Sequence, residues 1–156
     1  MKEVESMFEA IRTKDQDTLR ILLGRHPELV NTKDSRGFTP LIFATYFDNE
    51  AAAKVLIEHK AGIDAKDGTG NTALIGVCFK GNEKLVRLLI DTGADINAQN
   101  NLGTTPLIFA TMYDKENSVR LLLEKGADRA IKDNKGKSAL DYALEKGLEG
   151  LVGVLG

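Results

Sequence analysis

Residues 37–45 read GFTPLIFAT, and residues 103–111 read GTTPLIFAT. The two stretches differ only at their second letter, which is Phe38 in the first and Thr104 in the second. Between them lies GNTALIGVC at 70–78, and beyond them lies GKSALDYAL at 136–144. The opening glycines fall at 37, 70, 103 and 136, which is a constant interval. Self-similarity at a fixed period of roughly 20–50 residues indicates an architecture of stacked repeats.

Each unit is predicted to contain two helices. The first begins at a hydroxyl side chain, which can accept a hydrogen bond from a first-turn amide: Thr39, Thr72, Thr105 and Ser138. Pro40 and Pro106 follow at the first helical position, where proline loses no needed donor. The second helix carries apolar residues at i, i+3 and i+4, which lie on one helical face. With one serine among them, these are Leu19, Leu22, Leu23; Ala52, Val55, Leu56; Leu85, Leu88, Leu89; Ser118, Leu121, Leu122; and Leu151, Val154, Leu155. This series starts one unit before the glycines, so the chain holds five units and the first opens directly on a helix.

Composition restricts the classes of function. The chain has 156 residues, of which 42% are hydrophobic and 28% charged, as in a globular protein. A net charge of −2 gives no reason to expect nucleic acid or an anionic membrane as partner. Residues 1–10 contain three glutamates and do not resemble a secretory signal, and no stretch has the roughly 18 apolar residues of a membrane span. The one cysteine, Cys78, forms no intrachain disulfide, so we expect a reducing, cytoplasmic location.

No pattern of catalytic or metal-binding residues is present. The sequence lacks a P-loop, a G-x-S-x-G elbow, an H-E-x-x-H motif and a cysteine pair. His26 and His59 stand one period apart near the ends of second helices, where a polar or cationic side chain suits the helix dipole. Cys78 falls inside a predicted first helix and is expected to be a small packed residue. We therefore predict no catalytic residue, no metal site, no cofactor and no enzymatic activity.

The repeated unit resembles the ankyrin repeat. The resemblance rests on the 33-residue period, the D-x-x-G-x-T-P-L pattern at 34–41, the helix pair and the ending KGADR at 125–129, and it covers essentially the whole chain. It implies an all-α solenoid of stacked helix pairs with short β-hairpin fingers between repeats. It also implies a single domain over 1–156, divided into an N-terminal capping unit 1–33, internal repeats 34–66, 67–99 and 100–132, and a C-terminal capping repeat 133–156.

Two positions depart from the repeat pattern. Family repeats usually carry histidine after T-P-L, where it braces the backbone between neighbours; this chain has Ile42, Ile75, Ile108 and Asp141 there. We expect apolar packing to replace that brace. Gly93 and Gly126 lie just past second helices, where a left-handed residue ends a helix easily. Lys60 stands at the equivalent place in the second unit, so we expect a different loop there.

The resemblance implies a binding face formed by the finger tips and the exposed sides of the first helices, on the concave side of the stack. The candidate partner-binding residues at these positions are Arg36, Phe38, Tyr46, Phe47, Phe79, Lys80, Leu102, Met112, Tyr113 and Lys135. They include five of the nine aromatic residues, and exposed aromatic patches are typical of recognition surfaces. The alternative is that these side chains turn inward and fill space left by the missing histidines.

The charges along this strip favour one kind of partner. Its cations outnumber its acids and are Arg36, Lys66, Lys80, Lys132, Lys135, Lys137 and Lys146. A basic rim around an aromatic centre favours a partner protein with an acidic and partly apolar surface, and neither nucleic acid nor a membrane is expected.

We expect a monomer, and the alternative is a self-assembling structural protein. Glycines at 147, 150, 153 and 156 weaken the last helix, and the outer places of this terminal unit hold Gly150 and Gly153 instead of charged residues. This end is expected either to fray or to form a weak dimer contact.

Overall fold

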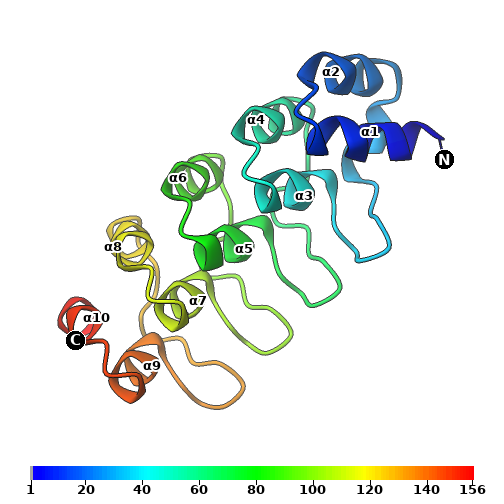
Figure 1. Cartoon of the computed structure of the whole chain (residues 1–156). Helices are drawn as coiled ribbons and strands as arrows, with labels where there is room; N and C mark the ends of the chain where they lie inside the picture. The colour runs from blue at the N-terminus through cyan, green and yellow to red at the C-terminus, as the bar shows by residue number, and fades with distance from the viewer. Residues whose placement is uncertain (1) are drawn as a thin grey trace.

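The computed structural model describes residues 2–156, and this part of the chain consists of ten α-helices and one short 3₁₀-helix. The helices form five consecutive pairs, which stack in two rows (Figure 1). The first row holds α1 (Lys2–Arg12), α3 (Pro40–Tyr46), α5 (Ala73–Lys80), α7 (Pro106–Met112) and α9 (Ala139–Glu145). The second row holds α2 (Gln16–Arg25), α4 (Glu50–Glu58), α6 (Glu83–Asp91), α8 (Glu116–Glu124) and α10 (Glu149–Leu155), with η1 (Pro27–Asn31) following α2. The all-helical stack confirms the solenoid prediction.

The predicted hydroxyl residues begin the first helices. Their side-chain oxygens accept hydrogen bonds from amides three residues later at 3.2–3.3 Å, as in Thr39 with Ile42, Thr72 with Ile75 and Ser138 with Asp141. Asp141 returns the interaction by accepting from the Ser138 amide, which completes a capping box. Each cap satisfies a backbone donor that the helix itself leaves free, so the start of these helices is decided locally.

The second helices turn the predicted apolar face inward. Of the fifteen residues in that series, twelve are buried, and Leu22, Leu88 and Val154 are half-buried. One continuous cluster of buried side chains runs from Met7 in α1 to Leu155 in α10. Stacking therefore supplies the core that a single helix pair of this size cannot form alone.

In three repeats isoleucine occupies the place where family repeats usually carry histidine, and it is buried. Ile75 is fully enclosed, and Ile42 and Ile108 are also buried. The prediction that apolar packing replaces a polar brace is confirmed at these three positions. Asp141 at the fourth position serves the capping box of α9 instead.

Loops project from the first row on the side away from the second helices (Figure 1). They stand where fingers were expected, but residues 2–156 contain no β-strand, so the expected β-hairpin form is not seen. Backbone hydrogen bonds join consecutive loops: the Gly68 amide to Arg36 O at 3.3 Å, Asn101 to Thr69 O at 3.1 Å, and Asn134 to Leu102 O at 2.9 Å. We call these loops the fingers. Their mutual hydrogen bonds hold them as a row.

The loop after α4 differs from its prediction. Lys60 has a positive φ of 70°, like Gly93 after α6, and its amide donates to Ile57 O at 3.0 Å as the Gly93 amide does to Ile90 O. The expectation of a different loop at Lys60 was wrong. A lysine is held in a conformation that usually favours glycine because the surrounding helix pair dictates the same turn.

No helix within residues 2–156 combines the length and the hydropathy needed to cross a membrane.

Candidate partner-binding face

The fingers and the open sides of α3, α5, α7 and α9 form one surface, which we call the finger face. All ten predicted residues lie on it: Arg36, Phe38, Leu102 and Lys135 in fingers, Tyr46 and Phe47 at the end of α3, Phe79 and Lys80 in α5, and Met112 and Tyr113 at the end of α7. Five large side chains are exposed: Tyr46 (49%), Phe47 (38%), Phe79 (40%), Leu102 (69%) and Tyr113 (46%). These five therefore do not serve as core. Phe38 and Met112 are half-buried against the core.

The aromatic rings form two groups. In the first, ring centroids lie 5.7 Å apart for Phe38 and Tyr46 and 5.2 Å apart for Tyr46 and Phe47. In the second, Phe79 lies 4.5 Å from Tyr113 and 5.9 Å from Phe109. Two of these four pairs, Tyr46 with Phe47 and Phe79 with Tyr113, are edge-to-face, an arrangement that ring quadrupoles favour. Contact with neighbouring rings restricts the rotamers of these side chains before any partner arrives.

Two of the predicted cations are engaged within the chain. Arg36 lies 2.9 Å from Asp34 and places its guanidinium 4.1 Å from the Phe38 ring centroid. Burial works against ionisation of Asp34, but hydrogen bonds from Arg36 and from backbone amides outweigh it and lower the pKa of that carboxyl. Lys80 lies 3.0 Å from Asp48 and also donates to the carbonyl of Tyr46. Both cations thus fix the aromatic residues beside them.

Apart from Lys66, the remaining positive charge lies toward the C-terminal end of the face. Lys137 pairs with Glu145 at 2.8 Å. Within residues 2–156, no ion pair involves Lys132, Lys135 or Lys146, and all three are exposed. These three lysines are free to meet an acidic group from outside. Lys66 is also exposed and forms no ion pair within residues 2–156, but its Nζ donates to Gln99 O at 3.0 Å.

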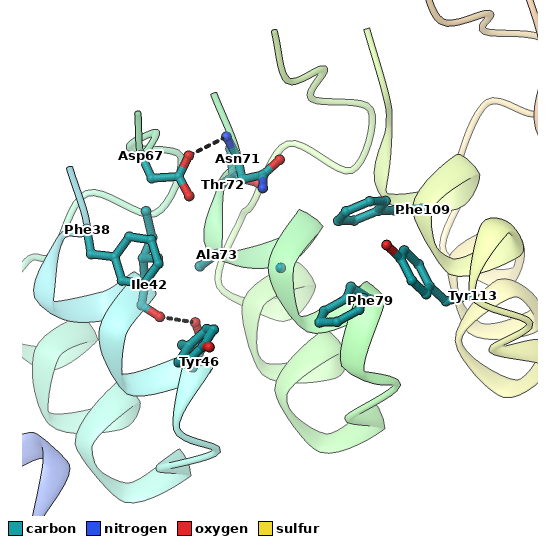
Figure 2. A pocket seen from close by; sticks show the side chains of 12 residues that line it. Phe38, Ile42, Tyr46, Asp67, Asn71, Thr72, Ala73, Phe79, Phe109 and Tyr113 are labelled. Carbon is teal, nitrogen blue, oxygen red and sulfur yellow. Dashed lines mark hydrogen bonds between the residues drawn. The ribbon is translucent and has the colours of Figure 1, made fainter. Parts of the chain in front are cut away.

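A cavity of about 240 Å³ separates the two ring groups (Figure 2). Phe38, Ile42 and Tyr46 line one side, and Phe79, Phe109 and Tyr113 line the other. Between them, its wall consists of Thr45, Asp67, Asn71, Thr72, Ala73 and Gly76. Two hydroxyls in this wall are already used: Thr45 Oγ1 donates to Ile42 O at 2.9 Å, and Thr72 Oγ1 accepts from the Ile75 amide.

Sequence reasoning missed this cavity, although the sequence contains a signal for it. Positions 43, 76, 109 and 142 are equivalent in the repeat, and they hold Phe43, Gly76, Phe109 and Tyr142. Three of these four equivalent positions hold an aromatic side chain, and the middle repeat has glycine instead. A methyl group built on Gly76 would meet no other atom within 4 Å beyond its own helix backbone, so the space beside it is open.

The residues considered for chemistry lie apart from one another. Cys78 is buried, and that burial raises the pKa of its thiol. His26 follows α2, and His59 follows α4 with Nδ1 2.8 Å from Val55 O, so both stand at the predicted helix C-termini. Among residues 2–156, no three His, Cys, Asp or Glu side chains converge on a point where a metal ion would bind.

Comparison with known proteins identifies the repeat. A family model for three copies of the ankyrin repeat matches residues 7–100 and again residues 74–155. Together the two matches span nearly the whole chain, in agreement with the resemblance described from the sequence. A search of curated proteins gave no match.

Proposed function

Since the chain belongs to the ankyrin-repeat family, whose members generally act as non-catalytic protein-interaction modules, we propose that it binds a partner protein through the finger face. The observation that carries this proposal is the exposure of Tyr46, Phe47, Phe79 and Tyr113 on one surface. Aromatic residues that are exposed together are enriched at the energetic centres of interfaces. Apolar residues that are exposed singly are common on protein surfaces and do not indicate a binding site, whereas these four lie on the same surface.

Rigid presentation is the mechanism that this geometry supports. The rings are held by one another and by Arg36 and Lys80, and the fingers are joined by backbone hydrogen bonds. A surface ordered in advance loses less conformational entropy on association, so more of the contact energy appears as affinity. The tyrosines also carry hydroxyl groups that can bond to a partner's backbone.

The partner is proposed to be acidic and partly apolar. Lys132, Lys135 and Lys146 are exposed cations of this face without an ion pair within residues 2–156, as is Lys66, whose Nζ donates to Gln99 O at 3.0 Å. Charges at an interface rim chiefly raise the association rate and set orientation. We therefore assign the aromatic groups to affinity and these lysines to steering.

The test is affinity capture from a lysate of the source organism. Wild type is compared with a Phe79→Glu, Tyr113→Ser double variant and with an Ile21→Glu control. Ile21 is an exposed apolar residue of α2 in the second row of helices, away from the finger face. A protein retained by wild type and by the control but lost with the double variant supports the proposal. Equal retention by all three contradicts it. Circular dichroism confirms that each bait is folded.

A second candidate function is self-association through the C-terminal end of the stack. Leu144 is 58% exposed, whereas Thr45, Cys78 and Thr111 at the equivalent positions of earlier repeats are buried beneath the next helix pair. Val152 is half-buried, although its counterparts Val86 and Val119 are enclosed. The open end is therefore apolar through Leu144 and Val152. The equivalents of Gly153 are exposed in the internal repeats too, and those of Gly150 are exposed or, at Ala51, half-buried.

Molar mass in solution distinguishes the two functions. Self-association predicts a mass that rises with concentration and returns to the monomer value in a Leu144→Glu variant. A monomer at every concentration would contradict self-association, and partner binding would then be the one function proposed. The α10 helix extends to Leu155. Arg129 donates a hydrogen bond to the Leu155 carbonyl at 3.2 Å, and this bond holds the last turn of the helix.

A further inference from the structure

The cavity on the finger face stands where other repeats carry an aromatic ring. Phe109, at the position equivalent to Gly76, packs its ring 5.9 Å from Phe79 and 5.4 Å from Tyr113. Phe43 packs in the same way, 5.1 Å from Phe8 and 4.7 Å from Phe47. Each ring lies between its own helix and the preceding first helix. At Gly76 the corresponding place, beside Tyr46 on α3, is the empty cavity.

A hydrogen-bond acceptor faces the same place without a donor. Each finger opens with a side chain whose Oδ1 accepts the backbone amides two and four residues later: Asp34, Asp67, Asn100 and Asp133. The second oxygen of Asp34 accepts from Arg36, and that of Asp133 accepts from the hydroxyl of Tyr142. Within residues 2–156, no donor reaches Oδ2 of Asp67, whose one dashed line in Figure 2 runs to Asn71.

The last repeat shows how both vacancies are filled at once. Tyr142 and Asp133 lie two periods after Gly76 and Asp67, so the two pairs occupy the same two repeat positions. In the last repeat the Tyr142 ring is buried and its hydroxyl donates to Asp133 Oδ2. In the middle repeat the ring and the hydroxyl are missing together, while the acceptor is retained.

We propose that the cavity beside Gly76 receives a tyrosine side chain of the partner protein, with its ring between Tyr46 and Phe79 and its hydroxyl donating to Asp67 Oδ2. This inference rests on the proposed function, because it names the group by which a partner would anchor on the finger face. The single inserted ring would join the two aromatic groups into one continuous patch. Tyrosine is also among the residues that dominate binding energy at interfaces.

Other occupants fit this site less well. Pockets for drug-sized molecules enclose roughly 300–1,000 Å³, and the cavity of about 240 Å³ is closer to the size of one side chain. A phenylalanine or leucine would cover Asp67 and leave its Oδ2 without a donor, which is unfavourable. A carboxylate ligand would be repelled by Asp67. Arginine is the strongest competitor, because Arg36 combines a carboxylate with an aromatic face in the neighbouring repeat. It lacks the flat ring that fills the equivalent place in the other repeats.

The experiment uses p-cresol, which is the side chain of tyrosine, as the probe. The full chain labelled with ¹⁵N is titrated with p-cresol, with toluene and with propylguanidinium, and amide shifts are followed by NMR. We expect p-cresol to shift the amides of residues 67–80 and to bind about 10-fold more tightly than toluene, since a hydrogen bond to a charged group contributes roughly one such factor. Equal binding of toluene, preferential binding of the guanidinium, or no shift with p-cresol would overturn the proposal.

Two variants localise the effect. Gly76→Tyr should abolish p-cresol binding, because its own ring recreates the arrangement of Tyr142. Asp67→Asn should reduce the preference for p-cresol over toluene by about 10-fold. This variant keeps the turn, since Asn100 plays the same backbone role naturally. If Gly76→Tyr fails to fold, Asp67→Asn still decides the question.

The result is separable from the proposed function. Failure of the p-cresol titration, together with loss of capture in the Phe79→Glu, Tyr113→Ser variant, would reject the tyrosine anchor and keep the binding face. Capture that is insensitive to the double variant would reject the face itself. A partner whose capture is lost with Gly76→Tyr alone, with circular dichroism unchanged, would connect the two proposals.

Discussion

The hydroxyl of Tyr142 donates a hydrogen bond to Asp133 Oδ2, while Oδ1 of the same carboxylate accepts the amides of Lys135 and Lys137. Asp133 thereby connects α9 to the finger that precedes it. Burial works against ionisation of Asp133, but these hydrogen bonds outweigh it and hold the pKa of the carboxyl below its usual value. Burial, together with the bond to Asp133, raises the pKa of Tyr142 to about 12.

The first prediction concerns alkaline pH. Because the folded state holds the Tyr142 proton more tightly than the unfolded chain, the stabilisation is complete below the unfolded pKa of about 10 and is lost as pH rises toward 12. We expect Tyr142→Phe to lower the free energy of unfolding by roughly 1.5–3 kcal/mol at neutral pH. The free energy of unfolding of this variant should also decrease less than that of wild type as the pH is raised into the alkaline range. Urea denaturation across this range measures both effects. An unchanged pH profile in Tyr142→Phe would contradict the prediction.

The second prediction concerns acid pH and Asp34. Its folded pKa is lowered, so its contribution is complete above the unfolded pKa of about 4 and is lost as pH falls through the folded value. Asp34→Asn should retain the turn, as Asn100 does, but show a smaller loss of stability on acidification than wild type. Denaturation at neutral pH and at about pH 3 compares the two. Parallel loss in both proteins would show that Asp34 contributes nothing to the slope.

The third prediction compares two glycines with nearly identical backbone. Gly103 and Gly136 have φ of 77° and 76°, but a methyl group on Gly103 would lie 2.6 Å from Asn134 Oδ1 and 2.8 Å from its backbone N. A methyl group on Gly136 meets nothing within 4 Å. We expect Gly136→Ala to cost about 1–2 kcal/mol from backbone strain, and Gly103→Ala to cost more because it separates adjacent fingers. Urea denaturation of both variants measures the two costs in stability. Equal costs would show that contact between adjacent fingers is unimportant.

The fourth prediction concerns Gly76 as a helix residue. Gly76→Ala should raise the free energy of unfolding by about 1 kcal/mol, because alanine has the higher helix propensity and the added methyl group has free space. Gly24→Ala in α2 is the matched control, since its methyl group also meets nothing within 4 Å. A gain at position 24 without one at position 76 would indicate that the cavity wall is less open than described.

Much of this fold follows from the sequence, because its determinants are local or periodic. The cap of Thr39 on Ile42 joins residues three apart, and the proline after it acts through its own ring. The apolar faces of the second helices recur once in every period, so they can be recognised without knowing what they contact. Lys60 shows the limit of local reasoning: its sequence predicted a different loop, and packing imposed the common one.

The resemblance to the ankyrin repeat also implied the surface on which the candidate site lies, and the register of the repeat then gave the residues at its finger tips and helix ends. The sequence did not show that Arg36 and Lys80 would pair with Asp34 and Asp48, because side-chain direction decides such pairs. Nor did it show that the open end of the stack is apolar through Leu144. A residue at that position is buried or exposed according to whether another repeat follows.

The repeat period, the helix pairs and the capped helix starts were determined by the sequence alone, because each depends on neighbours within a few residues or on exact repetition. The cavity was decided by tertiary structure. It requires Tyr46 from α3, Gly76 from α5 and Phe109 from α7, which come together only when three repeats stack. The space left by the missing side chain at Gly76 becomes a cavity only when residues of the neighbouring repeats surround it.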